Sequence, residues 1–126
     1  FHSNVSNPTR LLGYWVRERG ALPLEQAVQK ITSYPAQVYG IRDRGYLKPG
    51  AWADLMLVDP ATVARTPTRR AWDLPAGASR LTCDAVGLHG VWINGVPVVR
   101  DNQALPTAQR MPGKLLREFS ADQRLQ

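Results

Sequence analysis

The spacing of apolar residues divides the chain into a helical first part and a strand-rich second part. Apolar side chains recur at helical spacing in residues 8–19, 23–32 and 34–39, as in helices that bury one face. Gly20 and Gly40 follow the first and third of these segments, at the position where glycine commonly ends a helix. The pattern therefore predicts three helices within the first forty residues.

The first predicted helix combines an apolar stripe with one residue that disfavours helices. The stripe consists of Leu11, Leu12, Trp15 and Val16. Gly13 lies between them, although glycine inside a helix costs about 1 kcal/mol relative to alanine. We therefore expect another part of the chain to pack closely against Gly13.

A turn followed by a strand is predicted in residues 45–59. Residues 48–51 suit a type II turn, because Pro49 presets its own φ and Gly50 can adopt a positive φ. Four consecutive apolar residues follow in Leu55–Val58. Such a run is typical of a strand that is covered on both faces, so we expect an inner strand here.

Further strands are expected after residue 80. Residues 80–86 are a possible strand, and residues 90–94 and 96–100 form the clearest predicted hairpin. Asn94 and Gly95 connect the hairpin strands, because a type I′ turn requires positive φ at both central residues.

The remaining segments show no clear periodicity. Residues 59–77 are expected to form an irregular surface excursion, because they contain three prolines and no repeating pattern. Residues 102–113 are expected to be a loop, and residues 114–119 a last short helix or tail.

Composition and charge narrow the function classes. The 126 residues carry a net charge of +6. The sixteen basic residues are spread along the chain without a run of five, which argues against a nucleic-acid-binding surface. No apolar segment approaches the ~20 residues of a membrane span. The lone Cys83 cannot form an internal disulfide, and we expect a buried, inert thiol. The chain begins at Phe1, which suggests a processed or partial polypeptide.

Candidate catalytic chemistry is sparse. His2 and His89 are the two histidines, and neither lies in a motif with metal-ligand spacing. We expect His89 to be a turn residue. The carboxylates Asp43, Asp54, Asp59 and Asp73 are expected to act in turns and caps. We therefore assign no catalytic residue and no metal ligand to this chain.

Residues 45–59 nevertheless carry a specific string, Gly-x-Leu-x-Pro-Gly-x-x-Ala-Asp-Leu-x-x-x-Asp. This string resembles the segment where metal-dependent amidohydrolases leave their (β/α)8 barrel and enter a small β domain. Similarity to the D-aminoacylase branch, the N-acyl-D-amino-acid deacylases, continues in order through residues 7–20, 24–36, 41–63, 73–77, 91–95 and 112–117.

The resemblance implies an α/β family fold of which this chain is one part. Residues 1–40 would be the last helices of the barrel. Residues 41–101 would be the C-terminal part of a small β-sandwich domain, and residues 102–126 a loop and tail. His2 would lie on the loop after the last barrel strand, which makes it a candidate substrate-binding residue.

The same resemblance implies a cytoplasmic, zinc-dependent enzyme that hydrolyses the amide bond of N-acyl-D-amino acids. The family's zinc ligands come from barrel motifs that do not occur here, so this piece is expected to be structural and inactive alone. The alternatives are a non-catalytic β module or subunit that supports a separate hydrolase chain, and an independent binding protein.

The resemblance also implies a partner. In the family, strands from before the barrel complete the small β domain, and the helix stripe packs on the barrel. We therefore expect residues 1–126 to need the remainder of the same enzyme to cover their apolar surfaces, and an oligomer is compatible with this reading.

Overall fold

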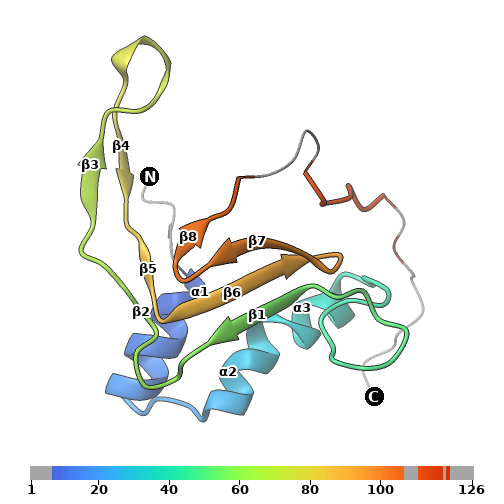
Figure 1. Ribbon diagram of the computed structural model, residues 1–126. Helices are drawn as coiled ribbons and strands as arrows, with labels where there is room; N and C mark the ends of the chain where they lie inside the picture. The colour runs from blue at the N-terminus through green and yellow to red at the C-terminus, as the bar shows by residue number, and fades with distance from the viewer. Residues whose placement is uncertain (1–6, 107–110, 118, 120–126) are drawn as a thin grey trace.

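The computed structural model describes residues 7–106, 111–117 and 119, which form a helical layer beneath a small antiparallel sheet (Figure 1). The helical elements are α1 (Asn7–Arg10), η1 (Leu11–Glu18), α2 (Leu24–Ile31), α3 (Ser33–Val38) and the short 3-10 turn η2 (Pro75–Gly77). The strands are β1 (Leu55–Val58), β2 (Ala64–Arg65), β3 (Arg69–Ala71), β4 (Arg80–Thr82), β5 (Ala85–Val86), β6 (Leu88–Ile93), β7 (Val96–Arg100) and β8 (Gln103–Ala104).

The predicted helices are present at the predicted places, but the first is not a plain α-helix. After α1 the chain widens into a π-helix, η1. Its last turn contains the wide hydrogen bond from the backbone N–H of Arg19 to the carbonyl of Tyr14, at 2.9 Å. Gly20 and Gly40 then adopt positive φ of 57° and 64°, as expected of residues that end helices.

The four-stranded sheet has the order β1-β6-β7-β8. The predicted β6–β7 hairpin is confirmed, with Ile93 paired to Val96 and with φ of 50° and 80° at Asn94 and Gly95. The predicted type II turn is also confirmed. Gly50 has a φ of 86°, and the N–H of Ala51 donates to the carbonyl of Lys48 at 3.2 Å.

The prediction that Leu55–Val58 is an inner strand is wrong in its burial. The segment is strand β1, but it pairs with β6 alone and occupies one edge of the sheet. Leu55, Met56 and Leu57 are 37%, 43% and 55% exposed. A run of apolar residues is typical of a strand whose faces are covered by other residues. In the described residues of this chain, β1 instead remains partly exposed.

Residues 59–77 are more regular than predicted. They contain β2, which pairs with β5, and β3, which pairs with β4. Both strands are too short to produce a readable alternation of apolar and polar residues. Similarly, the predicted loop 102–113 contains β8, which pairs with the end of β7. Residues 114–117 and 119 form no helix, and residue 118 lies outside the described part of the chain.

The core joins the helical layer to the loop between β1 and β2. Leu12, Ala27 and Val63 are 2%, 0% and 1% exposed, and partly buried apolar side chains such as Val58 pack around them. Gly13 makes this contact possible, because a Cβ there would lie 2.4 Å from the carbonyl oxygen of Val63. The close packing predicted at Gly13 is therefore present.

We predict that Gly13→Ala destabilises the protein by about 1–3 kcal/mol, because the added methyl group must displace the Val63 backbone. The ordinary helix preference for alanine would give the opposite sign. Gly113→Ala is the matched control, since among the described residues no atom beyond the chain neighbours lies within 4 Å of a Cβ at Gly113. Urea unfolding of the complete polypeptide that contains this chain measures both variants. A Gly13→Ala variant as stable as this control would contradict the prediction.

Candidate functional site

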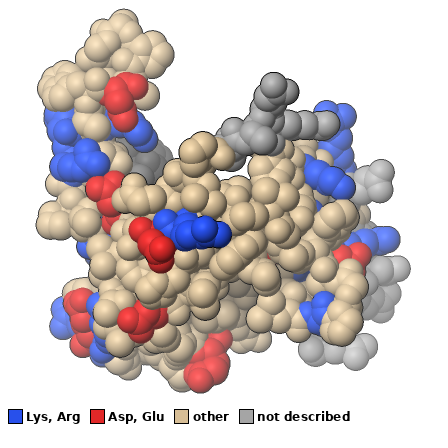
Figure 2. All heavy atoms as spheres, viewed as in Figure 1, with Lys and Arg blue, Asp and Glu red and all other residues tan. Residues whose placement is uncertain are grey.

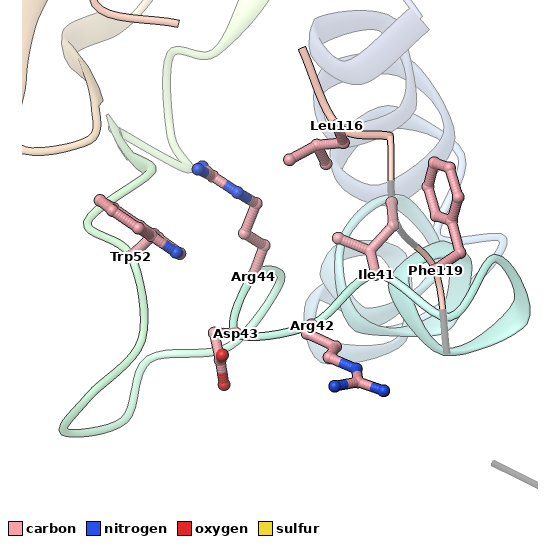
Figure 3. Close-up of a pocket in the computed structure, with 7 residues that line it drawn as sticks. All are labelled: Ile41, Arg42, Asp43, Arg44, Trp52, Leu116 and Phe119. Carbon is pink, nitrogen blue, oxygen red and sulfur yellow. The ribbon is translucent and has the colours of Figure 1, made fainter. Parts of the chain in front are cut away.

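A hollow of about 360 Å³ lies where the chain passes from the helices to the sheet (Figure 3). Trp52 and Arg44 lie on one side of it, and Leu116 lies opposite. We refer to it as the Arg44 hollow. Its lining residues are Ile41, Arg42, Asp43, Arg44, Trp52, Leu116 and Phe119.

Arg44 organises the polar part of this hollow. It forms an ion pair with Asp54, and its other terminal nitrogen donates to Oδ1 of Asn94 at 2.7 Å. The backbone N–H of Asn94 donates to Oδ1 of Asp54 at 2.8 Å. The amide of Asn94 in turn donates to the carbonyl of Pro112 at 2.6 Å. One half-buried network thus ties together the start of β1, the β6–β7 turn and the C-terminal segment.

Trp52 adds an aromatic surface that faces two cations. The guanidinium of Arg44 lies 5.2 Å from its ring centroid, and the ammonium of Lys114 lies 4.3 Å from it. Cations at these distances are attracted by the negative face of an indole. The hollow therefore combines the charged side chains of Arg42, Asp43 and Arg44 with an aromatic face and apolar walls.

The carboxylates outside the hollow are engaged in local structure. Asp59 accepts from the backbone N–H of Ala61 at 2.9 Å and from the hydroxyl of Thr62 at 2.7 Å. Asp73 forms two hydrogen bonds with Arg80. The Thr62 hydroxyl holds the pKa of Asp59 below its usual value, and the Arg80 guanidinium does the same for the pKa of Asp73. The expected turn role is confirmed for Asp59, whereas Asp73 forms an ion pair with Arg80 and caps no described helix.

The histidines do not assemble a metal site in the described residues. His2 lies outside the described part, so its predicted contact with substrate stays a prediction. His89 lies within β6 and not in a turn, contrary to expectation, and its Nδ1 is 3.6 Å from Oδ1 of Asp101. Within the described part of the chain, no three His, Cys, Asp or Glu side chains are grouped so that they could hold a metal ion. The donors present therefore do not fit a catalytic zinc, which uses three protein ligands.

Sequence reasoning missed the central role of Arg44. The sequence predicts Asn94 as a turn residue and Asp54 as a turn or cap residue. Their contacts with Arg44 span 50 and 10 positions of the chain. No local sequence pattern predicts a contact between residues so far apart in the chain.

Cys83, which is expected to be buried, is partly exposed. No described helix is long and apolar enough to cross a membrane.

Comparison with known proteins identifies the family. Residues 1–99 match the amidohydrolase family. The chain belongs to the amidohydrolase family. This confirms the resemblance that the sequence motifs indicated.

Two similar proteins are an N-acyl-D-glutamate deacylase and a D-aminoacylase. The N-acyl-D-glutamate deacylase of Alcaligenes xylosoxydans xylosoxydans is 44% identical over 109 residues, which are 86% of this chain and 20% of that protein. The D-aminoacylase of the same organism is 44% identical over 89 residues, covering 71% of this chain and 16% of that protein. This chain therefore spans about a fifth of the length of these relatives.

Solved structures agree with the sequence comparison. A crystal structure of D-aminoacylase has a TM-score of 0.62 at 36% identity and covers 79% of this chain and 19% of that chain. N-acyl-D-glutamate deacylase from Bordetella bronchiseptica, solved with zinc and a phosphonate inhibitor, has a TM-score of 0.52 at 42% identity, over 76% of this chain and 19% of that chain. The helices and sheet described above thus occur in larger amidohydrolases.

We predict that Asp59 stabilises the protein only while it is ionised. Its pKa in the folded chain lies below the ordinary 3.8, so its contribution is present above pH 3.8 and is lost as the pH falls through the folded value. In the complete polypeptide, Asp59→Asn should therefore melt at a lower temperature than the wild type near neutral pH, and the difference should vanish in acid.

The control for this prediction is Thr62→Ala, which removes the main cause of the pKa shift but keeps the carboxylate. Its pH dependence should be weaker than that of the wild type. A difference between wild type and Asp59→Asn that persists unchanged at acid pH would contradict the electrostatic origin.

Proposed function

We propose that this chain is the C-terminal portion of a cytoplasmic, zinc-dependent amidohydrolase that hydrolyses the amide bond of N-acyl-D-amino acids. The supporting observation is its 44% identity, over 86% of its length, to a fifth of an N-acyl-D-glutamate deacylase. Zinc bound elsewhere in the enzyme would polarise the scissile carbonyl and activate water. His2 is our candidate for a substrate contact from this chain.

We further propose that the residues of this chain have structural and not catalytic roles in that enzyme. The contacts of the described carboxylates support a structural role, because these side chains bind arginine side chains or the backbone N–H groups of turns. Asp54 binds Arg44, Asp73 binds Arg80, and Asp84 binds Arg69. None of these pairs leaves a carboxylate next to a second one for acid–base work.

The exposed apolar residues support the view that the remainder of the enzyme covers this chain. We propose that residues 1–40 are the end of the barrel and that residues 41–101 belong to a small β sandwich. Trp15 and Tyr34 on the helices are 44% and 51% exposed, and β1 is an open apolar edge. Fully burying an exposed large apolar side chain contributes about 1.5–3 kcal/mol. These side chains are already about half-buried, so covering several of them still supplies a sizeable part of the ~5–15 kcal/mol by which domains are stable.

We predict that residues 1–126 do not fold as an autonomous unit. The isolated chain should bind an apolar dye and melt without a cooperative transition, because its apolar surfaces lack their cover. Calorimetry and dye fluorescence measure this directly. A monomer with a single cooperative melt and no dye binding would instead favour an independent β module.

We also predict how activity divides between this chain and the complete enzyme. The complete polypeptide should contain zinc and release amino acid from N-acyl-D-glutamate or a related N-acyl-D-amino acid. Residues 1–126 alone should do neither. Metal analysis and a coupled deacylation assay, with and without added zinc, test both statements.

Two outcomes would redirect this proposal. Turnover by residues 1–126 that is lost in His2→Ala would make His2 catalytic. An intact cellular mass equal to this chain alone, with a barrel subunit co-purifying, would establish the alternative of a supporting subunit.

A further inference from the structure

The turn between β6 and β7 contains two neighbouring residues that can react with each other. Among the asparagines of the chain, Asn94 alone precedes a glycine. Because glycine has no side chain, nothing hinders the backbone nitrogen of Gly95 from attacking the side-chain amide carbon of Asn94. Gly95 is exposed and Asn94 is partly buried, and the sheet lies on the side of the molecule that Figure 2 shows. The turn is therefore open to water.

The reaction between the two residues is deamidation, which needs water as its one co-reactant. The backbone nitrogen of Gly95 gives up its proton and forms a bond to Cγ of Asn94. The bond from Cγ to Nδ2 breaks, and the amide nitrogen takes up a proton and leaves as ammonia. Water then opens the resulting succinimide ring at one of its two carbonyl carbons. The products are aspartate, from opening at Cγ, and isoaspartate, from opening at the backbone carbonyl.

Hydrogen bonds to three other segments restrain both reacting groups. The N–H of Gly95 donates to the carbonyl of Ala53 at 2.9 Å, so the attacking nitrogen is held in its protonated form. Oδ1 of Asn94 accepts from Arg44 at 2.7 Å, and Nδ2 donates to the carbonyl of Pro112 at 2.6 Å. With both ends of the amide engaged, the side chain cannot reorient for attack without breaking a hydrogen bond to a charged group, which is stronger than a neutral one.

Arg44 can restrain Asn94 because Asp54 holds Arg44 in place. Asp54 forms an ion pair with Arg44 and accepts from the backbone N–H of Asn94 at 2.8 Å. The side chains of Arg44 and Asp54 are 13% and 33% exposed, so water competes weakly for these contacts. Donation by Arg44 also polarises the amide carbonyl, which favours attack. The fixed orientation outweighs this effect, because no bond forms unless Cγ can approach the nitrogen.

We infer that Asn94 and Gly95 form a deamidation site that the contacts of Arg44, Asp54 and Pro112 keep closed in the folded protein. Loss of these contacts opens the site, because the amide is then free to turn toward the glycine nitrogen. The site depends on the chain's own residues and is independent of deacylase activity.

Deamidation would change the structure around the turn in two ways. Aspartate has an oxygen where Asn94 has the donor Nδ2, and this oxygen repels the carbonyl of Pro112. The attachment of the C-terminal segment is therefore weakened. Isoaspartate also adds a methylene group to the backbone of a two-residue turn, which disturbs the pairing of Ile93 with Val96.

The test is peptide mapping by mass spectrometry of the complete polypeptide, incubated at mildly alkaline pH. Trypsin cleaves after Arg80 and Arg100, and peptide 81–100 contains Asn94 as its sole asparagine and no glutamine. Replacement of ammonia by water raises its mass by nearly one unit. Asn94 should react at least about tenfold more slowly in the folded wild type than in guanidinium, which corresponds to ~1.4 kcal/mol. Equal rates in the two states would overturn the inference.

A matched pair of variants separates these contacts from general protection by folding. Arg44→Lys keeps a positive charge for Asp54 but lacks the two terminal nitrogens that bind Asp54 and Asn94 together. It should deamidate several-fold faster than the wild type. Arg80→Lys is the control, because Arg80 forms a similar pair with Asp73 outside the turn. It should react as the wild type does.

A second pair tests the same contacts from the carboxylate side. Asp54→Asn should speed the reaction at Asn94, whereas Asp73→Asn should not. Both new asparagines fall outside peptide 81–100. Melting curves show whether the two members of a pair are equally stable, and each pair that passes this check decides. A faster reaction in the Arg44 or Asp54 variant supports the inference, and equal rates within such a pair overturn it.

Hydrogen exchange tests the structural consequence. Asn94→Asp reproduces the aspartate product, and the amides of residues 113–117 should exchange several-fold faster than in the wild type. Asn102→Asp is the matched control, because Asn102 also has a positive φ and its Oδ1 accepts from the N–H of Leu88, a contact that aspartate keeps. Unchanged exchange in Asn94→Asp would overturn the weakened attachment of the C-terminal segment.

Discussion

The contact between Gly13 and the carbonyl of Val63 is the constraint on which the packing of this chain depends. It lets η1 approach the loop after β1, so that Leu12, Ala27 and Val63 form one buried cluster. Arg17 strengthens the junction, because its guanidinium donates to the carbonyl of Val63 at 2.7 Å. A larger residue at position 13 would separate the helices from the sheet.

From this junction the chain presents two unlike surfaces. One comprises the open edge of β1 and the exposed aromatic residues of the helices, where apolar side chains lack a cover. The other is the hairpin formed by β3 and β4, which carries its apolar residues away from the body on a charged support. Both surfaces leave apolar side chains exposed in the described residues of this chain.

The Arg44 network shows how a small β domain holds segments that are distant in sequence. Arg44 binds both Asp54 and Asn94, and Asn94 reaches the C-terminal segment at Pro112. Because Arg44 is half-buried and paired, its charge is balanced where water is partly excluded, which makes it costly to remove one partner alone. Trp52 covers the network and brings Lys114 to the same place.

The sequence by itself determined the helices, the type II turn at Pro49 and Gly50, the Asn94–Gly95 hairpin and the family. Each of these depends on residues that are neighbours along the chain, where proline, glycine and asparagine restrict or permit particular φ values. Tertiary structure alone decided the edge position of β1, the π-helical form of η1, the strands β2 and β3, and the partners of Arg44. Those features depend on contacts between segments tens of residues apart, which determine what covers a strand and which charges meet, and no local pattern encodes them.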